Sequence, residues 1–539
     1  MTSTTAGSGT SGRTKRLSLS PAASVLLIGG FCAALLALPG VTVATKSLDE
    51  LFLIFDQIHR IAAGQQPGVD FPAMLGPLTA FVPALVYRWT GSFGLAMPLS
   101  MAGFVLLTAA IASHVLATRL RPFLAVSFAG FLLLILAAPM SLGDGVTALS
   151  FAKFDIRIGW VALAVLVVLY LRPTADRPRA EALDIASAVL LTLALLYTRA
   201  PYGIVSVAFL VLLLTDRRQW RVAAPALMVI IAVVVALHLG SGVASAYHRE
   251  SWRLLTENGL LAGSLWSFFQ RGMTHLADFL LLGILASLTL WMRRSPRDLL
   301  CFLLCAIGGL IILSHNSNQP WGIISMHAAA VVAAELLLRR MDEQPAINQR
   351  QMVNASGVKL FFLAFVLPTS LHCAMALMLH AAAATIRAGD AVSLPRIDRV
   401  RLADLWTTDS FRGQTWYVGL QTQAVELLRQ SKQPLGVHMV LGEPDIASAA
   451  LDLAPSRGSI DLRWSTVMAE MPPVEPADRF AGIDTVLLRK TGESGEGLQQ
   501  RTLSFLRDNF SAVGEAKDWI LFQRRPSADA PPAPGLAPG

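Results

Sequence analysis

Long apolar runs separated by short polar segments dominate this sequence. The first run extends from about Pro21 to Ala44. The later runs cover 95–118, 123–141, 158–171, 183–198, 200–215, 222–239, 276–292, 298–314, 322–338 and 358–380. A membrane-spanning helix needs roughly 17 to 25 residues, and most runs approach that length. The pattern predicts an α-helical polytopic membrane protein with about 11 transmembrane helices.

The composition supports this prediction and argues against a nucleic-acid-binding protein. Hydrophobic residues make up 54% of the 539 residues and charged residues only 15%, which is unusual for a soluble domain. The formal net charge of +8 comes from Lys and Arg clusters between the apolar runs, as the positive-inside rule expects. The basic balance therefore indicates membrane topology, and no nucleic acid is expected as a partner. All four cysteines lie in apolar stretches, so no disulfide framework is expected.

The basic clusters also predict the orientation. Residues 1–20 form a disordered cytoplasmic amino terminus, and the first helix is retained instead of being cleaved as a signal peptide. A short stretch with two prolines, Pro77–Trp89, is expected to be a juxtamembrane helix, because a crossing there would move basic clusters to the outside. The protein is then placed in the cell inner membrane. Residues 45–94 form the first periplasmic loop of a transmembrane domain at 21–380.

After residue 381 the composition becomes that of a soluble domain. Strands are expected at 437–441, 485–489 and 519–523, and helices at 417–430 and 498–510. We expect a small α/β extracytoplasmic domain at 381–525 that acts as a lid, docks the acceptor or stabilises the protein. The tail at 526–539, rich in Pro and Ala, is expected to be disordered.

The stretch Leu48–Leu78 concentrates acid in a chain that carries few charges. Its carboxylates are Asp49, Glu50, Asp56 and Asp70. On a helical wheel Asp49, Asp56 and Arg60 share one stripe, and apolar residues fill the opposite half. The pattern predicts a helix in the membrane interface whose acidic face is turned toward water or a cavity.

The order of features in this stretch resembles the first outward loop of GT-C fold glycosyltransferases. These features are Asp49-Glu50 soon after the first span, then Gly64-Gln65-Gln66-Pro67-Gly68-Val69-Asp70-Phe71, then Gly76-Pro77-Leu78. The superfamily includes the protein O-mannosyltransferases and the bacterial transferases that add aminoarabinose or galacturonic acid to lipid A. The resemblance implies transfer of a sugar from a polyprenyl-phosphate donor to a lipid, glycan or protein acceptor in the periplasm.

Sugar transfer from a lipid phosphate needs a base for the attacking hydroxyl and positive charge for the departing phosphate. Asp49 and Glu50 are the catalytic candidates, and the sequence does not decide between them. The candidates for holding substrate include Asp70, which could instead only cap a turn. The basic candidates, with Arg199 preferred because its turn at the membrane boundary is so short, are Arg199, Arg249, Arg253, Arg157 and Arg60. Asp56 and Arg60 could instead form a simple helix-surface salt bridge.

No cofactor is expected, although carboxylates together with His59 could bind a divalent cation. The sequence contains no Walker-type or Rossmann glycine pattern, which favours a lipid-linked donor over a nucleotide sugar. The alternative function is a transporter or flippase for a lipid-linked or anionic substrate, with the boundary charges along its path. A third interpretation is a non-catalytic scaffold whose outer domain binds a partner.

Overall fold

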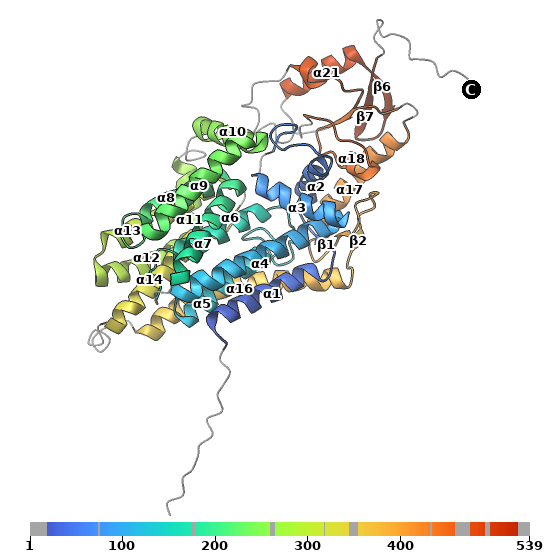
Figure 1. The fold of residues 1–539 in the computed structure, drawn as a ribbon. Coiled ribbons are helices and arrows are strands. Elements are labelled where there is room, and N and C mark those ends of the chain that lie inside the picture. The colour runs from blue at the N-terminus through green and yellow to red at the C-terminus, as the bar shows by residue number, and fades with distance from the viewer. Residues whose placement is uncertain are drawn as a thin grey trace, which may run out of the picture.

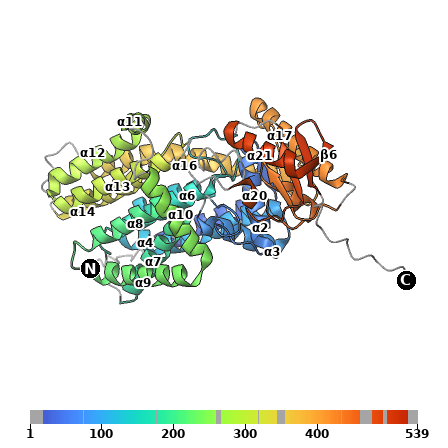
Figure 2. The same cartoon turned by 90° about the horizontal axis from the view of Figure 1, so that it is seen from above.

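The computed structural model describes residues 19–73, 76–174, 178–258, 265–316, 319–343, 354–431, 434–458, 475–490 and 496–525. Helices form an elongated bundle, and a smaller region of strands and helices from the carboxy-terminal part lies at one end of it (Figure 1). The view from above shows the same separation (Figure 2). Nearly all of the predicted 1–20 segment and the whole 526–539 tail lie outside the described residues.

A helix occupies each predicted apolar run. These helices are α1 (Pro21–Ala37), α4 (Phe93–Arg119), α5 (Pro122–Ala137), α6 (Phe154–Val168), α7 (Pro178–Thr198), α8 (Ala200–Leu213), α9 (Trp220–Gly240), α12 (Leu276–Arg293), α13 (Pro296–His315), α14 (Ile324–Glu343) and α16 (Ala355–Thr385). Among the described residues, 6 helices are long and apolar enough to cross a membrane, and α1, α5 and α8 are apolar but shorter. The total of about eleven spans therefore stays a prediction. Every residue of α6 is buried, so this helix lies inside the bundle.

The first helix is shorter than the sequence suggested. Helix α1 ends at Ala37, and the expectation that it continues to Ala44 is wrong. Pro39 has no backbone N–H with which to continue the helical hydrogen bonds, and Gly40 adopts a positive φ of 62°. The chain then forms strand β1 (Thr42–Ala44), which pairs in parallel with β3 (Val400–Leu402). Strand β2 (Asp390–Ala391) pairs with the other edge of β3, so this small sheet joins the first loop to the chain that follows α16.

The carboxy-terminal region is built on a second sheet. Its strands are β4 (His438–Leu441), β5 (Thr485–Arg489), β6 (Phe510–Glu515) and β7 (Trp519–Arg524), in the order β4-β5-β7-β6. Its helices are α17 (Thr408–Arg429), α18 (Ile446–Leu451), α20 (Pro476–Arg479) and α21 (Glu496–Asn509). Alternate strand residues face opposite sides. Val440 and Leu487 join the core shared with the bundle, whereas Met439 and Val486 join a separate core. One face of the sheet is thus continuous with the packing of the bundle.

Helix α2 (Leu48–Ala62) forms where the acidic stretch predicts a helix, followed by α3 (Pro77–Thr90). The expectation that the polar stripe of α2 faces water or a cavity is wrong for its second half. Asp56, His59 and Arg60 are all buried, because residues 445–458 of the carboxy-terminal region cover them. The His59 Nε2 lies 3.0 Å from the carbonyl oxygen of Leu453.

Arg60 is the centre of this contact. Its Nε donates to Asp56 Oδ1 at 2.6 Å, and its Nη1 donates to the Ser456 carbonyl at 2.6 Å. Its Nη2 lies 3.8 Å from Asp445 Oδ2, and the Asp445 amide donates to Asp56 Oδ2 at 3.1 Å. Burial raises the pKa of Asp56 despite the nearby Arg60. The pKa of Asp445 is lowered, because His438 and Arg60 outweigh its burial. The predicted i, i+4 salt bridge exists, but it is buried and it extends to Asp445 of the carboxy-terminal region.

We expect Arg60→Gln to destabilise the protein strongly, because it removes the cation that the buried carboxylates of Asp56 and Asp445 share. Breaking a buried ion pair costs about 3–5 kcal/mol. Arg396→Gln is the matched control. Arg396 pairs with Asp452, which lies in the 445–458 segment that also contacts Arg60, but the side chains of this pair are exposed. Exposed ion pairs contribute about 0–1 kcal/mol. Thermal unfolding of the purified protein in detergent measures both effects. Equal losses of melting temperature in the two variants would contradict the central role of Arg60.

Candidate functional site

Charged side chains from three separate segments, and an asparagine from a fourth, meet beside the first turn of α2. Glu50 Oε1 lies 3.7 Å from Lys153 Nζ. The Arg199 Nε lies 3.0 Å from Asp155 Oδ2, and its Nη1 donates to Asn316 Oδ1 at 2.9 Å. The charges of Lys153 and Asp155 both act on Glu50, so the two pairs form one electrostatic cluster. We call these five residues the charged cluster.

Helix ends hold most members of the charged cluster in place. Lys153 immediately precedes α6, and Asp155 lies in the first turn of that helix, where the helix dipole favours a negative charge. Arg199 is the extended residue between α7 and α8. It cannot move away as a residue in a long loop could, because helices begin and end on either side of it.

Helix α2 presents Asp49 and Glu50 in its first turn. The Leu48 amide donates to Gln414 Oε1 of α17 at 2.7 Å, which fixes the start of the helix. Burial raises the pKa of Glu50, and the charges of Asp49 and Asp155 add to this effect while Lys153 opposes it. Adjacent helical residues point about 100° apart, so the two carboxylates face different directions.

A second ion pair borders the charged cluster, and the sequence analysis did not identify it. Lys46 Nζ lies 3.0 Å from Asp144 Oδ1, and the Asp144 carbonyl lies 2.8 Å from His372 Nε2. The charge of Lys46 also acts to lower the pKa of Glu50. The signal available in the sequence was a lysine three residues before the acidic pair.

A network of buried polar side chains holds Asn316, the hydrogen-bond partner of Arg199. Asn316 Nδ2 donates to Tyr202 Oη at 3.0 Å and to Gln319 Oε1 at 3.0 Å. Gln319 in turn accepts from Trp160 Nε1 at 2.9 Å. Since each of these side chains is buried, the network restricts the orientation of the Arg199 guanidinium.

The structure separates the other predicted residues into groups. Arg157 lies on α6 two residues after Asp155 and is buried. Its Nη1 donates to the Leu136 carbonyl at 3.3 Å, while its Nε and Nη2 have no hydrogen-bond partner among the described residues. Arg157 is therefore close to the charged cluster in the chain and has unused donors.

Asp70 and Arg60 lie toward the other end of the first loop. Asp70 Oδ2 accepts from the Gln66 amide at 2.8 Å, and its Oδ1 lies 3.4 Å from Arg457 Nε. The Gly458 amide donates to the Asp70 carbonyl at 2.7 Å. Asp70 thus closes its own turn, which was the alternative to a role in substrate binding. It also contacts the carboxy-terminal region, as Arg60 does.

Arg249 and Arg253 lie on α10 (Gly242–Asn258), which is followed by α11 (Leu265–Thr274). Arg253 Nη2 donates to Glu250 Oε1 at 2.8 Å, and Arg249 is exposed. Helix α10 packs near the Arg199 turn, because Tyr247 Oη donates to the Leu196 carbonyl at 2.9 Å. These arginines therefore belong to the same side of the bundle as Arg199.

An apolar groove of about 480 Å³ lies among α3, α4, α6, α7, α9 and α10. Its wall includes Phe104, Leu107, Ile111 and Leu190. Ile158 and Tyr197 also line it, and they lie three residues from Asp155 and two residues from Arg199, respectively. The groove therefore reaches to within about one helical turn of the charged cluster.

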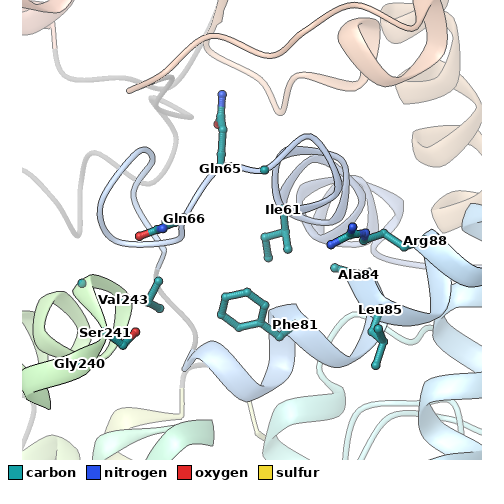
Figure 3. A pocket seen from close by; sticks show the side chains of 12 residues that line it. Ile61, Gln65, Gln66, Phe81, Ala84, Leu85, Arg88, Gly240, Ser241 and Val243 are labelled. Carbon is teal, nitrogen blue, oxygen red and sulfur yellow. The ribbon is translucent and has the colours of Figure 1, made fainter. Parts of the chain in front are cut away.

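A second pocket of about 420 Å³ adjoins the groove, and Phe81, Ser241 and Val243 line both (Figure 3). The pocket lies between Ile61 of α2 and Phe81 of α3, with Gln66 and Arg88 at its edge (Figure 3). Ile61 is eleven residues beyond Glu50, a rise of about 16 Å along α2. This pocket is thus distant from the acidic pair.

Among the described residues, no group of three or more His, Cys, Asp or Glu side chains could hold a metal ion. His59, which the sequence suggested as a ligand, contacts the Leu453 carbonyl instead. The charged cluster itself offers carboxylates beside Lys and Arg side chains, an arrangement suited to moving a proton and to binding an anion.

Comparison with known proteins extends this description. No protein-family model matches the sequence, and no curated protein matches it. Among solved structures, the chain is similar to ArnT from Cupriavidus metallidurans bound to undecaprenyl phosphate, with a TM-score of 0.51 and 14% identity, covering 94% of this chain and 99% of that one. The apo form of ArnT gives a TM-score of 0.43 and 14% identity, covering 92% of this chain and 97% of that one.

ArnT is a GT-C lipid A aminoarabinose transferase, and it belongs to one of the groups that the first-loop motifs resemble. The likeness to its lipid-bound form extends over nearly the whole of both chains, and at 14% identity it concerns the fold. The chain therefore has a fold similar to that of ArnT, in agreement with the resemblance of its first loop.

Proposed function

We propose that this protein is an integral-membrane glycosyltransferase that moves a sugar from a polyprenyl-phosphate donor to a lipid, polysaccharide or protein acceptor. One observation carries the proposal: the acidic end of α2 lies beside Lys153, next to the Asp155–Arg199 pair and close to the end of an apolar groove. A lipid-linked sugar phosphate needs these three features together. They are a base, cations for the phosphate and an apolar site for the chain.

The reaction assigns a role to each feature. The acceptor hydroxyl oxygen forms a bond to the anomeric carbon, and the bond from that carbon to the phosphate oxygen breaks. Its electron pair leaves on the phosphate, and the hydroxyl proton passes to Asp49 or Glu50. The transition state has oxocarbenium character, as in glycosidic bond cleavage. Lys153 and Arg199 offer charge-assisted hydrogen bonds to the departing phosphate.

The environment of Glu50 favours it as the base. Burial raises its pKa, and a carboxylate with a raised pKa is a better proton acceptor at neutral pH. Its side chain retains 33% exposure, which leaves room for an acceptor to approach. Asp49 lies in the same turn and supports the local negative charge.

The apolar groove would hold the polyprenyl chain. Each methylene group removed from water contributes about 0.8 kcal/mol, so a groove of this size adds substantial affinity for a long isoprenoid. The solved ArnT structure holds undecaprenyl phosphate, which supports a donor of the same class here. We place the reaction at the periplasmic face of the inner membrane, with the amino terminus in the cytoplasm and the carboxy-terminal region outside, because the basic clusters then lie inside.

We expect the double variant Asp49→Asn, Glu50→Gln to abolish transfer, and Glu50→Gln alone to reduce the rate by about 10² to 10⁴, the usual contribution of a general base. Mass spectrometry of glycolipids and glycans from cells that carry each variant measures the sugar transferred. Glu343→Gln is the control, because that carboxylate is exposed and pairs only with Arg340 of its own helix among the described residues. Full activity in the double variant would refute the proposal.

The pH profile tests the role of Lys153. Lys153 lowers the pKa of Glu50, so Lys153→Met should raise it further. A general base must be deprotonated to act, and the acidic limb of kcat/KM should therefore move to higher pH in the variant. Measuring transfer across the acidic range with purified enzyme checks the shift. A limb that stays in place, or moves to lower pH, would exclude Glu50 as the titrating base.

A further inference from the structure

Two histidines face each other at the turn between α9 and α10. His238 lies in the last turn of α9, and His248 lies in the second turn of α10. Their Nδ1 atoms are 3.2 Å apart, and their rings stack at 5.4 Å with an interplanar angle of 17°. His238 is exposed, so the pair is accessible from outside the protein.

We propose that His238 and His248 hold a divalent transition-metal ion of the zinc class. Zinc binds imidazole nitrogen at about 2.0–2.1 Å. Two nitrogens 3.2 Å apart then subtend an angle of about 100° at a shared ion, between the octahedral and tetrahedral values. The two nitrogens already lie at the separation that one ion requires, and rotation of the two imidazoles turns their lone pairs, which now point at each other, toward that ion without a rearrangement of α9 or α10.

The ligand type defines which ions fit. Neutral imidazole suits zinc, copper, nickel and cobalt, whereas magnesium and calcium prefer oxygen ligands. In the part of the chain that the structure describes, no third His, Cys, Asp or Glu completes the group. The remaining coordination positions therefore go to water or to an oxygen of a bound ligand, as at open zinc sites.

The open coordination positions of the proposed metal site lie beside the apolar groove. The Tyr197 ring lies 5.7 Å from the His248 ring, and Tyr197 lines the apolar groove together with Leu237, the neighbour of His238. The buried Tyr197 hydroxyl has no hydrogen-bond partner among the described residues. An anionic or hydroxyl oxygen at the mouth of the groove could use both the ion and this hydroxyl.

Zinc binding to the intact protein tests the site without any substrate. The full chain, purified in detergent without a polyhistidine tag and stripped with chelator, is dialysed against Zn²⁺ alone, and the retained metal is counted. We expect one ion per chain in the unmodified protein. His238→Gln and His248→Gln should each weaken binding at least tenfold, since losing even an outer-shell partner of a metal ligand typically costs 10- to 100-fold.

Ser245→Ala, on α10 between the turn and His248, is the control and should bind Zn²⁺ normally. Added Zn²⁺ should raise the melting temperature of the unmodified protein and of this control but not of the histidine variants, which separates metal binding from loss of fold. Undiminished binding in both histidine variants, or no bound ion in the unmodified protein, would overturn the site. Because the readout involves no sugar transfer, this result and the test of Asp49 and Glu50 can fail independently.

Discussion

The ion pairs and hydrogen bonds of the buried Arg60 guanidinium are the interactions on which the contact between the first loop and the carboxy-terminal region depends. A buried arginine needs partners for its charge and its donors. Here Asp56 of the same helix, Asp445 and the Ser456 carbonyl supply them. Because two of these partners lie almost four hundred residues later in the chain, separating α2 from the carboxy-terminal region would remove them from Arg60 and uncover the buried Asp56–Arg60 pair. Strand β1 and the Gln414 contact fix the preceding part of the same loop.

This anchoring holds the first loop in place beside the charged cluster, where we propose that sugar transfer occurs. The charged cluster takes residues from four segments, and each lies at or next to a helix end held by the bundle. The surface changes from apolar, in the groove, to charged, at the cations and carboxylates, over about one helical turn. An amphiphile with a long apolar tail and an anionic head matches this change, and a soluble nucleotide sugar does not.

The sequence predicted the helices well, because apolar runs of spanning length have few alternatives. Arg199 was preferred among the basic candidates because its turn is so short, and it lies in the charged cluster. Strand β1 was missed because its β-branched residues continue an apolar run, and only its partner β3 makes it a strand. The buried polar stripe of α2 was missed for a similar reason: an exposed and a covered acidic face look identical until the distant segment that covers it is known.

Helix α2 is therefore attached to the carboxy-terminal region at both ends, through Arg60 in its last turn and through the Leu48–Gln414 contact at its start. Ten residues separate Arg60 from Glu50, a span of about 15 Å. In the proposed mechanism, a tilt of about 4° about Arg60 would move the Glu50 carboxylate by about 1 Å, and a misplacement of that size can change a rate by about 10²-fold. The double attachment opposes such a tilt, so the positional precision of Asp49 and Glu50 depends on segments more than three hundred residues later in the chain.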